Sequence, residues 1–179
     1  MIHVMHDIET LAKVSNKPLP LSLGAVKFDG GKIIDRFHIR FDTTDAQRFG
    51  LDIEADTVEW WMHIDRAAAR AQLHEMGTID LFAGLDGYSM WINQTPVDER
   101  GSAWGNGSNF DNAKLKGIFD AAGVEWPFGY KQEECYRTIR NRFPDVPFLR
   151  QGVHHGALDD AESQAAHLIM INMQHGLGL

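Results

Sequence analysis

Three runs of branched and aromatic residues at the start of the chain constrain its fold more than any other feature. They span residues 2–8, 21–28 and 33–41. Such residues favour strands, and Asp29-Gly30-Gly31 between the second and third runs has the composition of a hairpin turn. We therefore expect the chain to begin with an antiparallel meander of three strands.

The rest of the sequence alternates between helical patterns and short strand patterns. Residues 43–52 are polar and mixed, and they predict a loop. Helices are predicted at residues 56–63, 65–75, 79–93, 111–122, 133–142 and 157–174. Residues 102–104, just before Gly105-Asn106-Gly107, predict a short strand. Strands first, then alternating strand and helix, predict a mixed-sheet α/β fold, and we expect residues 1–179 to form a single domain.

The charge balance argues against a protein that coats nucleic acid by bulk attraction. The chain has 17 Lys and Arg against 25 Asp and Glu, a net charge of −8. Residues 131–150 are the exception, because five basic residues against three acidic ones give this segment a local charge of +2. This segment could hold a polyanion locally.

Cysteine usage and the first residues bear on the compartment. The single cysteine, Cys135, has no partner for a disulfide within the chain. A lone thiol fits a reducing compartment, so we expect a cytoplasmic protein. The first ten residues have neither a basic start nor a small-residue cleavage site, and no apolar run approaches the ~20 residues of a membrane span. Secretion and a membrane partner are not expected.

Two acidic motifs stand where predicted strands end. In Asp7-Ile8-Glu9, the strand period of two places both carboxylates on one face while Ile8 points into the core. In residues 104–111, an apolar strand breaks at glycines and enters a helix at Asp111. A solvated strand end and an ordinary helix-start acid explain each motif when it is taken alone.

A histidine and an acid form a third motif at the start of the last predicted helix. His155 precedes Asp160 by five positions across a loop-to-helix junction. Acids near a helix N-terminus are favourable in themselves, and a histidine beside a glycine often only fills a turn. His154 is one residue too far from Asp160 for this spacing, so we interpret it as a loop neighbour. The order of the three motifs on one α/β fold favours a functional interpretation over three structural ones.

Over nearly its whole length, the chain resembles the DEDDh 3′→5′ exonucleases of the RNase H-like superfamily. Their three motifs resemble Asp7-Ile8-Glu9-Thr10, Asn109-Phe110-Asp111, and His155 with Asp160. The resemblance is closest to the phage and prophage exonuclease VIII-like proteins and to the bacterial exoribonuclease AS group. The shared signs are Asp56-Thr57-Val58-Glu59-Trp60-Trp61 and Trp104-Gly105-Asn106-Gly107. His6 departs from the pattern, because these families usually have an apolar residue before the first aspartate.

The resemblance implies an RNase H-like mixed β-sheet flanked by helices, and a two-metal-ion 3′→5′ exonuclease. Such an enzyme hydrolyses phosphodiester bonds at the 3′ ends of single-stranded DNA or RNA and releases nucleoside 5′-monophosphates. Four carboxylates can hold two hard divalent cations, Mg²⁺ or Mn²⁺, ~3.5 to 4 Å apart. In this chain they are Asp7, Glu9, Asp111 and Asp160. Zinc is not expected, because carboxylates dominate these ligands and Cys135 has no partner of its kind.

His155 is the expected general base. An ordinary histidine pKa of ~6.5 lets this side chain take a proton from the attacking water near neutral pH. Thr10 and Leu11 follow the first motif and could line the terminal nucleotide, and Asn109 belongs to the second motif. Arg137 and its helix neighbour three residues on, Arg140, share a face and could contact backbone phosphates.

Two adjacent tryptophans are candidates for base stacking. Adjacent helical residues point about 100° apart, so Trp60 and Trp61 are not expected to share a face. One of them is expected to pack in the core and the other to stack on a base. The resemblance to the exoribonuclease group favours Trp61 as the residue that contacts substrate.

Two other functions compete with this interpretation. An RNase H-like fold could serve as a nucleic-acid or protein binding module that does not cleave, although such a module would be expected to have lost at least one acid. An RNase H-type endonuclease also uses carboxylates, but the spacing of His155 and Asp160 belongs to the exonucleases. The residues do not distinguish DNA from RNA, and relatives make a homodimer a reasonable expectation.

Overall fold

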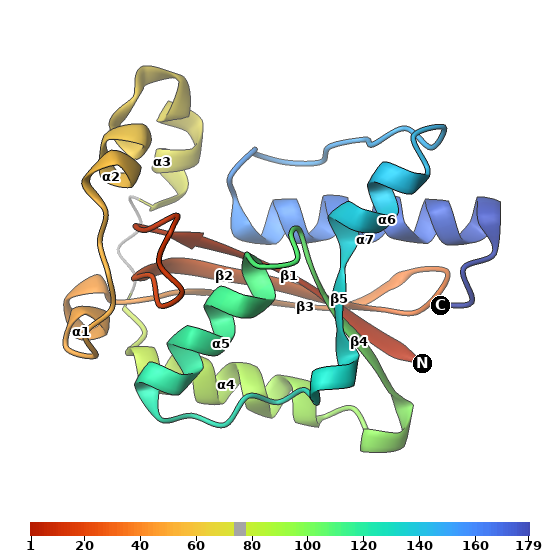
Figure 1. Ribbon diagram of the computed structural model, residues 1–179, viewed down its shortest axis with the longest axis horizontal. Helices are drawn as coiled ribbons and strands as arrows, with labels where there is room; N and C mark the ends of the chain where they lie inside the picture. The colour runs from red at the N-terminus through yellow and green to blue at the C-terminus, as the bar shows by residue number, and fades with distance from the viewer. Residues whose placement is uncertain (74–77) are drawn as a thin grey trace.

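A mixed β-sheet forms the centre of the fold (Figure 1). The computed structural model describes residues 1–73 and 78–179, and within them the sheet has the strand order β3-β2-β1-β4-β5. The strands are β1 Ile2–Thr10, β2 Pro20–Phe28, β3 Ile33–Arg40, β4 Arg100–Gly105 and β5 Glu133–Cys135. Strand β2 pairs antiparallel with both β1 and β3, which confirms the predicted meander. Strand β4 runs parallel to β1, and β5 runs parallel to β4.

Helices cover both faces of the sheet. They are α1 Thr43–Gln47, α2 Ala55–Met62, α3 Ala67–Leu73, α4 Leu81–Asn93, α5 Asp111–Ala122, α6 Tyr136–Arg142 and α7 Ala157–His175. Short 3₁₀ turns occupy Ile64–Arg66, Val97–Glu99 and Tyr130–Gln132. Helices α4 and α5 lie on one face, α6 and α7 lie on the other, and α2 and α3 stand beside the carboxyl end of β1 (Figure 1). Among the described residues, none of the helices combines the length and the apolar character needed to cross a bilayer.

The prediction of a loop over residues 43–52 is wrong, because this segment contains α1. The carboxylate of Asp42 accepts hydrogen bonds from the backbone N–H groups of Thr44 at 2.8 Å and Asp45 at 3.2 Å. These bonds satisfy donors that the first turn of a helix leaves free, so a cap starts a helix where apolar periodicity is weak.

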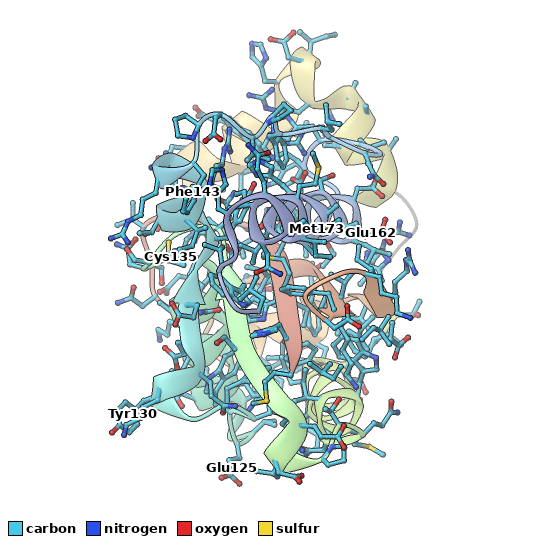
Figure 2. All side chains as sticks on the ribbon, turned by 90° about the vertical axis from the view of Figure 1, so that its right-hand side faces the viewer. Glu125, Tyr130, Cys135, Phe143, Glu162 and Met173 are labelled. Carbon is cyan, nitrogen blue, oxygen red and sulfur yellow. The ribbon has the colours of Figure 1, made fainter. Side chains whose placement is uncertain are left out.

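The prediction of one helix over residues 133–142 is also wrong in its first part. Glu133–Cys135 form β5, and helix α6 starts only at Tyr136. The pairing of Glu133 with Ala103 and of Cys135 with Gly105 holds the backbone of this segment in an extended conformation. The local sequence pattern does not predict pairing with a distant strand. Figure 2 shows Cys135 on this strand, which forms an edge of the sheet.

The helical segment between the meander and β4 is confirmed with shifted boundaries. The helix predicted over residues 65–75 is a 3₁₀ turn followed by α3, and residues 74 and 75 lie outside the described residues. The helix predicted over 79–93 begins at Leu81, because Ile79 forms a β-bridge with Phe41.

Strand β1 separates two apolar clusters, one on each face of the sheet. Val4 and Ile8 belong to the cluster under α4 and α5, whereas Met5 belongs to the cluster under α7. Because side chains alternate along a strand, Asp7 and Glu9 lie on the same face as Met5. The structure thus confirms that Ile8 enters the core while the two carboxylates face the other way, toward α7.

A glycine on β2 brings the start of α7 close to these carboxylates. Gly24 pairs directly with Asp7 in the sheet. A Cβ atom at Gly24 would lie 2.2 Å from the backbone nitrogen of Leu158, so only glycine lets the first turn of α7 pack this tightly. This close approach places Asp160, which lies in the same first turn of α7, beside the carboxyl end of β1.

Candidate active site

The predicted carboxylates converge on one buried site. Asp7 and Glu9 come from β1, Asp111 from the start of α5 and Asp160 from the first turn of α7. One oxygen from each of Asp7, Glu9 and Asp160 lies within 4.8 Å of the others. Asp111 lines the same cleft and is only 1% exposed. The convergence of four acids from three distant segments of the sequence is therefore a feature of the fold.

Crowding and burial make these acids hard to ionise without a counter-charge. Burial raises the pKa of Asp7 well above its ordinary value, and the neighbouring Asp111 raises it further. Burial, and then Asp7 and Asp111, raise the pKa of Glu9 in the same direction. Burial raises the pKa of Asp111 to about 6, although hydrogen bonds from backbone groups, first that of Asn106, oppose the change. The arrangement favours either protons or bound cations.

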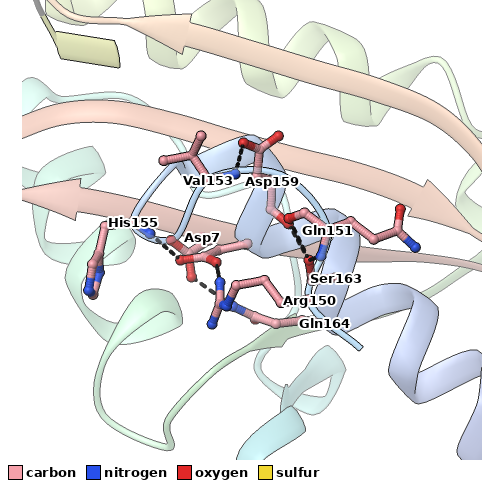
Figure 3. Close-up of polar contacts among 9 residues, drawn as sticks. Asp7, Arg150, Gln151, Val153, His155, Asp159, Ser163 and Gln164 are labelled. Atoms are coloured by element: carbon pink, nitrogen blue, oxygen red, sulfur yellow. Dashed lines mark hydrogen bonds and ion pairs between the residues drawn. The ribbon is translucent and has the colours of Figure 1, made fainter. Parts of the chain in front are cut away.

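Three donors partly compensate the acids in this structure (Figure 3). The Gln164 side-chain amide donates to Asp7 Oδ1 at 2.9 Å. The Arg150 guanidinium pairs with Oδ1 of Asp160, and the backbone N–H of His155 donates to Oδ2 of the same carboxylate at 3.1 Å. Sequence analysis missed Gln164 and the role of Arg150. The spacing from Asp160 to Gln164 on α7 could have revealed the glutamine, because residues four apart share a helix face.

His155 lies beside the acids in an unusual backbone conformation. Its φ of 65° is in the left-handed region, where residues other than glycine are uncommon. The ring stacks on His154 with centroids 3.7 Å apart and meets the edge of Trp60 at 4.8 Å. Burial, followed by the neighbouring His154 ring, lowers the pKa of His155 to about 4, and Arg66 and Arg150 act in the same direction. The imidazole is therefore neutral at pH 7 and able to accept a proton.

A cleft of about 320 Å³ opens over the acids. Thr10, Trp60 and Trp61 line it near α2, and Arg137, Arg140 and Arg150 line it near α6. The predicted basic segment therefore contributes three guanidinium groups to the acidic site. A cleft with carboxylates at its base and arginines at its rim can hold cations and phosphate oxygens together.

The two tryptophans divide as expected, with one of them in the core. Trp61 is 5% exposed, and its indole N–H donates to the backbone oxygen of Thr10 at 3.0 Å. Trp60 is 36% exposed and contacts the ring of His155. Trp61 is thus the more buried of the pair, although both line the cleft. The preference for Trp61 as the base-stacking residue stays a prediction, and the greater exposure of Trp60 favours Trp60 instead.

Of the other predicted substrate contacts, Thr10 and Arg137 line the cleft, whereas Leu11 and Asn109 do not. Thr10 lines the cleft, and its hydroxyl donates to the backbone oxygen of Ala12 at 2.8 Å. Leu11 packs against the apolar cluster under α4 and α5. Asn109 is exposed on the turn before α5. Arg137 lines the cleft and donates to the backbone oxygen of Asn106 at 2.5 Å.

His6 has a place outside the cleft. It is fully buried on the α4 and α5 face, where Nε2 contacts Oδ1 of Asn112 and Nδ1 lies 2.9 Å from the hydroxyl of Tyr88. The side-chain amide of Asn112 donates to the backbone oxygen of Ala103 on β4 at 3.2 Å. His6 therefore ties β1 to the first turn of α5, next to Asp111.

The carboxylate set fits hard divalent cations. Such ions take oxygen ligands, and Asp7, Glu9 and Asp160 already hold oxygens close to one another. A cation would also relieve the repulsion that raises the pKa of these acids. Asp111, whose charge acts on both Asp7 and Glu9, stands where it can complete the set.

One family model and several solved structures match this chain. The family model of the 3′-5′ exoribonuclease Rv2179c-like domain matches residues 2–172. The nuclease domain of 3′hExo, a DEDDh family member bound to rAMP, has a TM-score of 0.68 and 14% identity over 99% of this chain and 94% of that chain. No curated protein sequence matches this chain.

Exonuclease I shares the same architecture. A structure of it has a TM-score of 0.66 and 14% identity over 98% of this chain, which spans only 41% of that chain. An E. coli exonuclease I complex with a dT13 oligonucleotide has a TM-score of 0.65 and 13% identity, over 98% of this chain and 42% of that chain. Such likenesses establish the fold, which is the RNase H-like mixed sheet flanked by helices that the sequence predicts. Closeness to the phage exonuclease VIII-like proteins stays a prediction.

Proposed function

This chain belongs to the 3′-5′ exoribonuclease Rv2179c-like domain family, and we propose that it uses two divalent cations, Mg²⁺ or Mn²⁺, to remove nucleoside 5′-monophosphates from the 3′ ends of single-stranded RNA. It is a 3′-5′ exonuclease of the DEDDh type. The observation that supports the metal chemistry is the close set of carboxylate oxygens from Asp7, Glu9 and Asp160, with Asp111 in the same cleft. The preference for RNA over DNA follows from the family.

The side chains divide the work of phosphodiester hydrolysis. Asp7, Glu9, Asp111 and Asp160 would hold the cations, which would supply Lewis-acid stabilisation of the charge that develops on the phosphodiester oxygens. His155, neutral at pH 7, takes the proton of the attacking water. Backbone contacts hold the acids in place, such as the bond from the Asn106 N–H to Asp111 Oδ2 at 2.6 Å.

The cleft itself limits what can be bound. Its volume of about 320 Å³ lies at the low end of pockets that hold one small ligand, which suits a single terminal nucleotide. Trp60 and Trp61 offer aromatic surface to its base. Arg137 and Arg140, exposed on α6, offer guanidinium groups to the phosphates that follow it.

Digestion of a 5′-labelled single strand tests the proposal. Matched RNA and DNA oligonucleotides are incubated with the purified chain in Mg²⁺, in Mn²⁺ and in a chelator. We expect a ladder that shortens one nucleotide at a time, with RNA degraded faster than DNA, and no cleavage with the chelator. Asp7→Ala is expected to abolish cleavage, whereas Asp86→Asn, an exposed acid on α4, is expected to leave it unchanged.

Three outcomes would contradict the proposal. Internal fragments instead of a ladder would point to an endonuclease. Full activity of a purified variant with both Asp7→Ala and Asp160→Ala would exclude the carboxylate site. Binding of the single strand without any cleavage under all metal conditions would favour a binding module.

A further inference from the structure

A second set of potential metal ligands shares one residue with the carboxylate site. A ring nitrogen of His154, a ring nitrogen of His155 and a carboxylate oxygen of Asp160 all lie within 4.8 Å of one another. His154 is exposed, His155 is half-buried and Asp160 is buried, so the set runs from the surface into the cleft. Asp160 also belongs to the set with Asp7 and Glu9. The cluster that joins His154, His155 and Asp160 is called the histidine set below.

The two sets differ in the cations that suit them. An all-carboxylate set suits hard ions such as Mg²⁺ and Mn²⁺, whereas imidazole ligands suit zinc and its neighbours among the transition metals. Two histidines with one carboxylate, and a fourth position left to water, is a common arrangement at zinc. We propose that His154, His155 and Asp160 form a binding site for Zn²⁺, and that zinc bound there inhibits the nuclease.

The local structure prepares the ligands for this role. The rings of His154 and His155 are stacked with an interplanar angle of 20°, which keeps them side by side in the same turn. The Asp160 carboxylate is fixed by Arg150 and by the backbone N–H of His155. Ligand atoms around tetrahedral zinc stand roughly 3.3 Å apart, given bonds of ~2.0 to 2.2 Å. The three ligand atoms lie within 4.8 Å of one another, so they must approach by at most about 1.5 Å to bind the ion.

Charges around the set act in both directions. Arg66 and Arg150 face the two rings, and they oppose a cation there. Asp7 and Glu9 lie close to Asp160 and favour one. Burial and the two arginines lower the pKa of His154, and the pKa of His155 is lowered as well.

Inhibition follows from the shared ligands. Zinc on a ring nitrogen of His155 engages the imidazole that would accept the proton of the attacking water. Zinc on Asp160 withdraws an oxygen from the set that holds the catalytic cations. The inhibitory effect rests on the proposed function, whereas binding of zinc to the histidine set does not.

Zinc binding is measured first, without any nuclease assay. The full chain at pH 7.5 in excess Mg²⁺ is titrated with Zn²⁺ by calorimetry, and with Co²⁺ by the visible absorption of its tetrahedral complexes. We expect one zinc ion per chain and a tetrahedral cobalt spectrum. His154→Gln is expected to weaken zinc binding at least tenfold and to remove the cobalt band. His63→Gln, which alters a surface histidine paired with Asp65, is the matched control and is expected to change neither.

The nuclease assay then separates the two claims. The rate of each variant with added Zn²⁺ is compared with its own zinc-free rate. We expect zinc to inhibit the wild-type chain and His63→Gln at similar concentrations. The zinc concentration that inhibits His154→Gln is expected to be at least tenfold higher. Equal zinc affinity of the wild-type chain and His154→Gln would overturn the site, and so would the lack of any zinc binding. Zinc binding that depends on His154 in a chain without nuclease activity would sustain the site and refute the proposed function.

Discussion

Asp111 should destabilise the metal-free protein as the pH rises. The folded chain holds the Asp111 proton up to about pH 6, whereas the ordinary pKa of this group is 3.8. Because the unfolded chain releases this proton first, the free energy of unfolding falls as the pH rises from about 4 to about 7. A difference of about two in pKa corresponds to about 3 kcal/mol. Asp111→Asn removes this contribution, and its side-chain oxygen can still accept the bond from the Asn106 N–H.

Urea unfolding in a chelator tests this reasoning. At pH 8, Asp111→Asn is expected to be about 3 kcal/mol more stable than the wild-type chain, or about 6 to 12 °C higher in melting temperature. Near pH 4 the difference is expected to fall below about 1 kcal/mol. Added Mn²⁺ is expected to stabilise the wild-type chain more than the variant, because ligands that bind only the folded state stabilise it by mass action. Asp86→Asn, which is exposed on α4, serves as the control.

Two results would refute it. The first is a stability difference between Asp111→Asn and the wild-type chain that does not change with pH. The second is a variant that is less stable than the wild-type chain at pH 8. Either would mean that burial does not raise the pKa of Asp111 in the metal-free protein.

Three further predictions concern the contact of Gly24 with α7, the general base His155 and the aromatic residue Trp60. Gly24→Ala is expected to destabilise the chain by about 1 to 3 kcal/mol in urea unfolding and to lower its affinity for Mn²⁺ in calorimetry. Gly31→Ala is the control, because a Cβ there meets nothing closer than 3.6 Å, and it is expected to change neither quantity. His155→Ala is expected to lower the exonuclease rate about 10² to 10⁴-fold. The pKa of His155 is lowered to about 4, so the base stays neutral from pH 8 down to pH 6 and the rate is expected to lack a His155-dependent fall over that range. A fall that is lost in His155→Ala would contradict the lowered pKa, whereas an unchanged rate of His155→Ala would contradict the role of His155 as the base. Trp60→Ala is expected to weaken binding of an uncleavable RNA by about 1 to 3 kcal/mol while stability stays constant, and unchanged binding would leave Trp61 as the stacking residue.

The carboxylate site could be predicted because its motifs obey local rules. The period of two along a strand places Asp7 and Glu9 together whatever the rest of the fold does. A helix that begins at an acid places Asp111 at the end of α5 that faces the sheet. The resemblance then joined these positions to His155 and Asp160, and the structure brings all of them to one cleft.

The features that were missed depend on contacts between distant segments. Strand β5 exists because Glu133–Cys135 pair with β4, and nothing within the segment itself announces that partner. His6 is buried between Tyr88 and Asn112, residues more than eighty positions away, so its role could not be read from its neighbours in sequence. The pairing of Arg150 with Asp160 depends on how the loop before α7 folds back. Periodicity describes an element, but it does not describe what the element meets.

The glycine contact between β2 and α7 has a consequence for metal selectivity. Gly24 contributes no chemistry to the reaction, yet the main chain of α7 packs directly against it. This contact sets the distance between α7 and the sheet. The spacing between the backbones that carry Asp7 and Asp160 is therefore set by this contact. A substitution at Gly24 would move the two carboxylates apart without altering either of them, so the size of cation that the site accepts depends on a residue of β2 that is not itself a ligand.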